Sequence, residues 1–161
     1  MTISIFTTND AIGSTPSATP VPYIFGANAV FALLHQARTT QPFKIVPVPS
    51  GDTSTRCNVS ALVVAITKSE NSRVVVVTDT GTLLGTCQHL EVIVGRTVVV
   101  TAAWKPGPYP DGDAALNLGM AIAAAQTLEA GIYVAINGFV RPAKAVQLNS
   151  TKDQFQTSAP L

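Results

Sequence analysis

Residues 73–78 read Arg-Val-Val-Val-Val-Thr, and residues 96–101 read Arg-Thr-Val-Val-Val-Thr. β-Branched side chains favour strands because they pack well on a pleated surface. A continuous apolar run, as opposed to an alternating one, is typical of a strand that is buried on both faces, as in parallel sheets covered by helices. These two stretches therefore predict the centre of a parallel sheet.

Further strands and helices are predicted on both sides of this centre. Strand patterns occupy Ile3 to Thr7, Phe43 to Val48 and Ile132 to Ile136. Helical patterns lie between the strands, over residues 27–38, 55–68, 82–90 and 113–130. Regular alternation of strand and helix predicts an α/β fold with right-handed crossovers. The expected architecture is a doubly wound, mostly parallel sheet in three layers, Rossmann-like or flavodoxin-like.

Apolar residues at helical spacing predict the buried side of each helix. The last helix is expected to begin at Asp113 as its N-cap and to end before Gly131 as its C-cap glycine. The predicted buried stripes are Val30, Phe31, Leu34 and Ala37 in the first helix, Val59, Leu62, Val63 and Ile66 in the second, and Leu116, Met120, Ala123 and Ala124 in the last.

Length and composition limit the possible classes of protein. The chain has 161 residues, of which 47% are hydrophobic, and we expect one domain over residues 1–161 with a core that needs neither disulfides nor metals. A net charge of +1 predicts neither a nucleic-acid partner nor an anionic membrane surface. No apolar run approaches the ~18 residues of a membrane-spanning helix, and no secretory leader is visible. A cytoplasmic location is expected.

Histidine and cysteine give no sign of a metal or a cofactor. Cys57 and Cys87 lack metal-ligand spacing and are predicted to be buried free thiols. His35 and His89 fall within predicted helices without a partner at ligand or triad spacing, so both are predicted to be structural or surface residues.

Polar side chains follow the predicted strands, at the edge where open parallel sheets bind ligands. Hydroxyls and carboxylates at this edge suit a small zwitterionic or amide ligand; the alternative is that they only cap the following helices. The residues are Thr8, Asn9 and Asp10 after the first strand, Ser50 to Thr53 after the second, Thr78 to Thr82 after the third, and Lys105 and Asp113 after the fourth.

Five segments in these regions, in order and with consistent spacing, resemble the N-terminal domain of bacterial L-asparaginases, in particular the short single-domain members. They are Ile5-Phe6-Thr7-Thr8-Asn9-Asp10-Ala11-Ile12, Val76-Val77-Thr78-Asp79-Thr80-Gly81-Thr82, Val100-Thr101-Ala102-Ala103-Trp104-Lys105-Pro106, Asp113-Ala114-Ala115-Leu116-Asn117-Leu118-Gly119 and Gly131-Ile132-Tyr133-Val134-Ala135-Ile136-Asn137-Gly138.

The resemblance implies hydrolysis of the side-chain amide of asparagine by a threonine nucleophile, with ammonia released. It implies asparagine or aspartate as the ligand, no cofactor, and a homo-oligomer. The family's nucleophilic threonine falls on Ala11, its Thr-Asp pair on Thr80 and Gly81, and its lysine on Leu148. Alanine cannot attack a carbonyl, and leucine cannot polarise a hydroxyl.

Other positions of the resemblance keep polar groups that suit substrate binding. Asp52 and Thr53 match the family's Asp-Ser, Tyr23 falls where the short enzymes have a tyrosine, and Asp79 is expected to replace the missing carboxylate. Three interpretations stay open: an amidohydrolase, an inactive family member that retains ligand binding, and an assembly scaffold.

Overall fold

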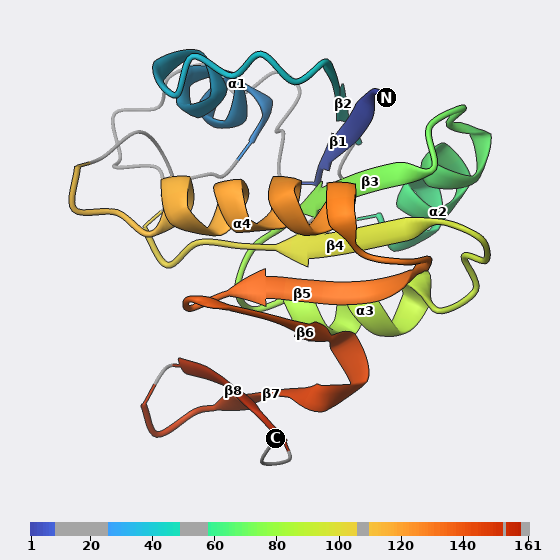
Figure 1. Ribbon diagram of the computed structural model, residues 1–161. Helices are drawn as coiled ribbons and strands as arrows, with labels where there is room; N and C mark the ends of the chain where they lie inside the picture. The colour runs from blue at the N-terminus through green and yellow to red at the C-terminus, as the bar shows by residue number, and fades with distance from the viewer. Residues whose placement is uncertain (9–25, 49–57, 106–109, 153, 159–161) are drawn as a thin grey trace.

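The computed structural model describes residues 1–8, 26–48, 58–105, 110–152 and 154–158 (Figure 1). A six-stranded sheet has the order β2-β1-β3-β4-β5-β6, in which the first five strands are parallel and β6 is antiparallel to β5. The predicted mostly parallel α/β sheet is confirmed. Its strands are β1 (Ile3–Thr7), β2 (Phe43–Pro47), β3 (Arg73–Val77), β4 (Thr97–Thr101), β5 (Gly131–Ile136) and β6 (Phe139–Pro142).

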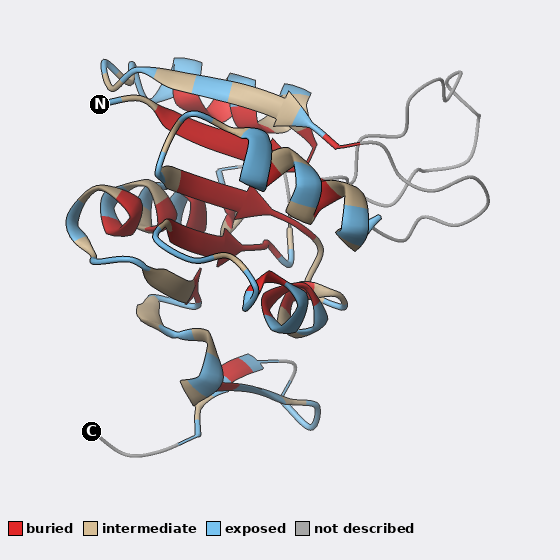
Figure 2. Cartoon of the chain, turned by 90° about the vertical axis from the view of Figure 1, so that its right-hand side faces the viewer, coloured by how far each residue is buried: buried red, intermediate tan, exposed pale blue. Residues whose placement is uncertain are grey.

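Helices cover both faces of the sheet, which confirms the three-layer arrangement. Buried residues of α1 (Ala27–Gln36) and α4 (Ala114–Thr127) pack on one face. Buried residues of α2 (Val59–Lys68) and α3 (Leu83–Leu90) pack on the other. The valine runs serve both cores: Val75 belongs to the first and Val76 to the second, and both are fully buried. Figure 2 shows the central strands buried along their length.

The predicted buried stripes are partly correct. In α2, Leu62 and Ile66 are buried, whereas Val59 and Val63 are half-buried. Ala37, just after α1, and Ala123, in α4, were predicted to be buried and are exposed. In α1, Val30, Leu33 and Leu34 are buried, whereas Phe31 is 57% exposed. In α4, Leu116 is 58% exposed, and the buried residues are Ala114, Asn117, Leu118, Ala121, Ala124 and Ala125. Because α4 is apolar on nearly every side, its sequence pattern does not define which side packs on the sheet.

The end of the last helix also differs from the prediction. Helix α4 ends at Thr127, and Leu128 has an extended backbone. Gly131 is the first residue of β5 and not a C-cap: it pairs with Thr97, and its N–H donates to the Arg96 carbonyl. Asp113 does occupy the N-cap position, although its carboxylate accepts no backbone N–H of the helix and bonds the backbone of the preceding loop and the Asn117 side chain instead.

Three strands near the carboxyl end were not predicted. Asn137 and Gly138, both at positive φ, turn β5 into β6, and Asn-Gly between apolar runs is a recognised hairpin signal. After the short 3₁₀ helix η1 (Ala143–Ala145), β7 (Val146–Asn149) pairs with β8 (Gln154–Thr157) in a separate two-stranded sheet below the main one in Figure 1. Within the described residues, no helix is long and apolar enough to cross a membrane.

Candidate active site

The strand order places a topological switch point between β1 and β3. From β1 the chain winds outward to β2, and from β3 it winds the other way through β4 and β5. Ligands of doubly wound sheets bind outside the carboxyl ends of the strands at such a point. Thr8 follows β1 here, and Thr78 follows β3. Their hydroxyl oxygens lie 3.0 Å apart, and both residues are buried.

The backbone holds these two threonines in line with the sheet. The Thr8 N–H donates to the Val77 carbonyl at 3.1 Å, and the Thr78 N–H donates to the Thr101 carbonyl at 3.0 Å. The strand ladder therefore continues one residue past each strand and leaves the two hydroxyls side by side.

A chain of hydrogen bonds runs from these hydroxyls to a carboxylate. The Thr78 and Thr82 hydroxyl oxygens are 2.9 Å apart, and the Thr82 hydroxyl donates to Asp79 Oδ2 at 2.8 Å. Since the only hydroxyl proton of Thr82 goes to Asp79, Thr78 must donate to Thr82, and Thr8 donates to Thr78. The hydroxyl protons of Thr78 and Thr82 thus point toward Asp79, while the Thr8 hydroxyl also lies 3.4 Å from the Val77 carbonyl oxygen. Thr82 and Asp79, at one end of this series of hydrogen bonds, are partly exposed.

The loop after β4 has its own polar centre, Asp113. Its carboxylate accepts the N–H of Trp104 at 3.0 Å, the N–H of Lys105 at 2.9 Å and one amide hydrogen of Asn117 at 3.0 Å. The buried Asn117 side chain also donates to the Ala102 carbonyl at 2.9 Å. These bonds fix the loop backbone.

Lys105, the cation expected at this edge, forms a salt bridge with Asp111. This hydrogen bond from the ammonium group lowers the pKa of the Asp111 carboxyl below its usual value. The Asp111 side chain is 72% exposed, so solvent screens the pair.

A pocket of about 450 Å³ lies between this loop and the β7–β8 hairpin, lined by Trp104, Asn137, Lys152, Gln154 and Phe155. The Trp104 and Phe155 rings are in contact, with centroids 5.9 Å apart. Leu148 pairs with Phe155 across the hairpin and is 40% exposed. The pocket was not predicted, because the hairpin that supplies three of its residues was not.

The structure groups some of the predicted site residues and does not describe others. Asp79, Thr80 and Gly81 form the turn between β3 and α3, close to Thr8 through the hydrogen-bond chain. Leu148 lies on the two-stranded sheet instead. The predicted site residues Ala11, Tyr23, Asp52 and Thr53, and also Cys57, lie outside the described residues.

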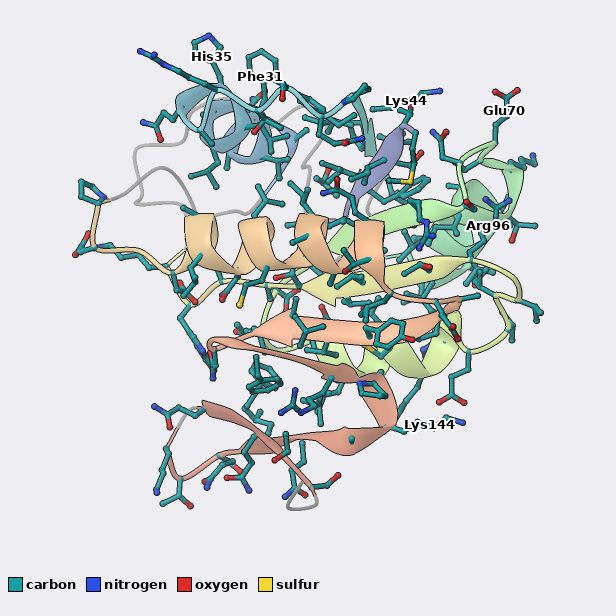
Figure 3. The ribbon with its side chains drawn as sticks, in the orientation of Figure 1. Phe31, His35, Lys44, Glu70, Arg96 and Lys144 are labelled. Atoms are coloured by element: carbon teal, nitrogen blue, oxygen red, sulfur yellow. The ribbon has the colours of Figure 1, made fainter. Side chains whose placement is uncertain are left out.

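Neither histidine joins this site. His89 shares a 2.7 Å hydrogen bond with the Gly85 carbonyl one turn earlier in α3. His35 is exposed on α1 beside Phe31, and Figure 3 shows both side chains on the outer side of that helix. Among the described residues, no group of histidine, cysteine and carboxylate side chains could hold a metal ion. The buried thiol of Cys87 is confirmed, and burial raises its pKa to about 12.

A family model described as the N-terminal domain of asparaginase matches residues 2–159. The chain belongs to the asparaginase family. No curated protein matches the sequence. Asparaginases do match among solved structures, and the chain spans about half their length.

Three of these asparaginase structures share the fold at low sequence identity. The thermostable L-asparaginase from Thermococcus kodakarensis has 21% identity and a TM-score of 0.75, over 98% of this chain and 51% of that one. A probable cytoplasmic L-asparaginase from Campylobacter jejuni has 22% identity and a TM-score of 0.67, over 96% and 52%. L-asparaginase I from Vibrio cholerae O1 biovar eltor has 18% identity and a TM-score of 0.72, over 97% and 51%.

Proposed function

We propose that this chain hydrolyses the side-chain amide of L-asparagine to L-aspartate and ammonia. The observation that supports this most directly is the hydrogen-bonded group of Thr8, Thr78, Thr82 and Asp79 at the β1/β3 switch point of an asparaginase-family fold. Threonine hydroxyls attack amide carbonyls when a neighbouring base accepts their proton, and a carboxylate within hydrogen-bond distance is such a base.

Substrate binding is proposed for residues on neighbouring loops. By the family resemblance, Asp52, Thr53 and Tyr23 bind the substrate, and the Thr53 hydroxyl helps to hold its α-carboxylate. No metal or organic cofactor is needed for acyl transfer to a hydroxyl.

The cellular setting follows the family in this proposal. We expect a homo-oligomer, a dimer or larger. We also expect a cytoplasmic location, as in the description of the Campylobacter jejuni neighbour.

A second candidate function is ligand binding without turnover. It is favoured by Ala11, Gly81 and Leu148, which stand where the resemblance places the nucleophile, the carboxylate and the lysine of the family. Loss of a nucleophile costs several orders of magnitude in rate when no other group replaces it. In this candidate function the scaffold retains affinity for aspartate or asparagine.

Ammonia release from L-asparagine separates the two functions. Purified chain at high concentration is incubated with L-asparagine, and ammonia is compared with that from heat-denatured protein and from L-alanine amide as a non-substrate control. Release that depends on L-asparagine and is absent from both controls supports hydrolysis. Folded protein that binds L-aspartate in calorimetry but releases no ammonia is the ligand-binding scaffold, and hydrolysis is then wrong.

A further inference from the structure

We propose that Thr82 is the nucleophile of this chain and Asp79 is its general base. This inference rests on the amide hydrolysis proposed above. It assigns the chemistry to a residue pair in which the carboxylate precedes the threonine by three positions, in place of the family positions Ala11, Thr80 and Gly81.

The two side chains already have the geometry of a nucleophile and its base. The Thr82 hydroxyl lies 2.8 Å from Asp79 Oδ2, within the range required for direct proton transfer. Thr82 and Asp79 are partly exposed, whereas Thr8 and Thr78 are buried. Of the three threonines in this hydrogen-bond chain, Thr82 is the one that is partly exposed, and we assign the reaction with substrate to its hydroxyl.

The hydrogen-bond directions leave the Thr82 oxygen ready to attack. This oxygen accepts the Thr78 proton in one lone pair, and its own proton is held by Asp79. The other lone pair is left for a carbonyl carbon. The Thr78 hydroxyl also stabilises the negative charge that develops on this oxygen as the proton leaves.

Gly81 gives Asp79 the room it needs. A Cβ atom at position 81 would lie 3.2 Å from Asp79 Oδ1, tighter than an ordinary contact. The family position that carries a carboxylate by resemblance is a glycine here, and the carboxylate of Asp79 lies against that glycine. The glycine at position 81 therefore leaves space for the Asp79 carboxylate in this turn.

Capping of α3 alone does not explain the arrangement. Asp79 Oδ1 accepts the Thr82 N–H at 2.8 Å, and this bond is sufficient for a turn before a helix. Thr82 is the N-cap residue of α3, but its hydroxyl does not bond a backbone N–H of the helix. Its proton goes to the second carboxylate oxygen instead, so the Thr82 hydroxyl does not serve as a cap.

The reaction balances with these two groups and water. As Thr82 Oγ1 bonds the side-chain carbonyl carbon of asparagine, its proton passes to Asp79 Oδ2. Asp79 then gives this proton to the departing nitrogen, the C–N bond breaks, and ammonia leaves an aspartyl ester on Thr82. Water attacks the ester carbon, Asp79 takes the water proton, and its return to Thr82 Oγ1 releases L-aspartate.

Four variants test the assignment in the full chain by kcat for ammonia release from L-asparagine. Asp79→Asn keeps an oxygen that can accept the Thr82 N–H but cannot take a proton, so it separates base from cap. Thr82→Ala removes the nucleophile, Thr82→Ser keeps it, and Thr80→Ala removes the hydroxyl at the family position. Circular dichroism and the melting temperature show that each variant is folded.

We expect kcat to fall about 1,000-fold or more in Thr82→Ala and Asp79→Asn, and to stay within about tenfold in Thr82→Ser and Thr80→Ala. The assignment is overturned if the unmodified chain turns over and folded Thr82→Ala is still active. It is overturned equally if Thr80→Ala loses turnover while Thr82→Ala keeps it. In both cases the proposed hydrolysis stands. Absence of turnover in the unmodified chain removes the hydrolysis itself, and the assignment with it.

Discussion

Both oxygens of the Asp79 carboxylate bond one residue, Thr82: Oδ1 accepts its backbone N–H at 2.8 Å and Oδ2 accepts its hydroxyl at 2.8 Å. The turn between β3 and α3 is therefore tied at both the backbone and the side chain of Thr82. Thr82 in turn contacts Thr78, which contacts Thr8 at the end of β1. The two strands at the switch point are linked through side chains as well as through the sheet.

The hydrogen bond from the Thr82 N–H to Asp79 Oδ1 predicts that two substitutions of Asp79 differ in their effect on stability. We expect Asp79→Ala to lower the free energy of unfolding by about 1 kcal/mol, because the Thr82 N–H loses its acceptor. We expect Asp79→Asn to lower it by only about 0.3 kcal/mol, because the amide oxygen of asparagine can still accept that N–H. Urea unfolding followed by circular dichroism measures both. Equal losses in the two variants would show that the backbone bond is not what Asp79 contributes to stability.

Arg73 closes the opposite end of the sheet, where α4 ends. Its guanidinium donates to the Thr97 hydroxyl at 2.8 Å, to the Ala125 carbonyl at 3.2 Å and to the Leu128 carbonyl. We expect Arg73→Ala to destabilise the fold by about 1–3 kcal/mol, since the carbonyls at the helix end lose a charged donor. The matched control is Lys44→Ala on the exposed edge of β2, with an expected change below about 0.5 kcal/mol. A loss for Arg73→Ala no larger than that of this control would contradict the capping role.

The hydrogen bonds of the Asn117 side chain are expected to stabilise the loop after β4. Asn117→Ala removes the donor to the buried Ala102 carbonyl and one donor to Asp113, and we expect a cost of about 1–3 kcal/mol. Thr127→Ala on the same helix removes an exposed bond to the Ala123 carbonyl and should cost less than about 0.5 kcal/mol. Chemical unfolding compares the two, and similar values would argue against a structural role for Asn117.

The raised pKa of Cys87, about 12, predicts an unreactive thiol and a loss of stability at alkaline pH. In a Cys57→Ser background, the native protein should react slowly with a thiol reagent at pH 8 and rapidly once unfolded. The thiol of an unfolded chain ionises near its ordinary pKa of 9.0, whereas burial raises the pKa of the folded Cys87 thiol to about 12. Between these values the unfolded state binds fewer protons, so the free energy of unfolding should fall as pH rises. A Cys87→Ala variant should lose this part of the pH dependence; the same slope in both proteins would assign it elsewhere.

The sequence was sufficient to predict the sheet centre because the valine runs at 73–78 and 96–101 have one consistent interpretation. It was insufficient for α4, where alanine and leucine on all sides give no periodic contrast, so Leu116 was placed in the core and is exposed. The β7–β8 hairpin was missed because its exposed residues, such as Gln147 and Gln156, give it little hydrophobic pattern. The Asn-Gly pair at 137–138 is a local hairpin signal, but no strand was predicted after it.

For the candidate site, the sequence predicted the edge of the sheet but not the links between side chains. Thr8, Thr78, Asp79 and Thr82 were all expected after strands, and their chain of hydrogen bonds depends on the β1/β3 adjacency, which a linear pattern does not contain. The resemblance drew attention to Thr80 and Gly81, whereas the contact to a carboxylate is made by Thr82. A spacing of three residues between Asp79 and Thr82 was the one local signal for that contact.

Trapping the acyl-enzyme identifies the nucleophile of this chain directly. The chain is mixed with excess L-asparagine, quenched in acid during turnover and digested with trypsin, which separates Thr8 in the peptide of residues 1–38 from Thr82 in the peptide of residues 74–96. If Thr82 is the nucleophile, the second peptide gains the mass of one aspartyl group, which fragmentation locates at Thr82 and which is absent from Thr82→Ala. An aspartyl group on the first peptide, or at Thr80, would contradict this assignment.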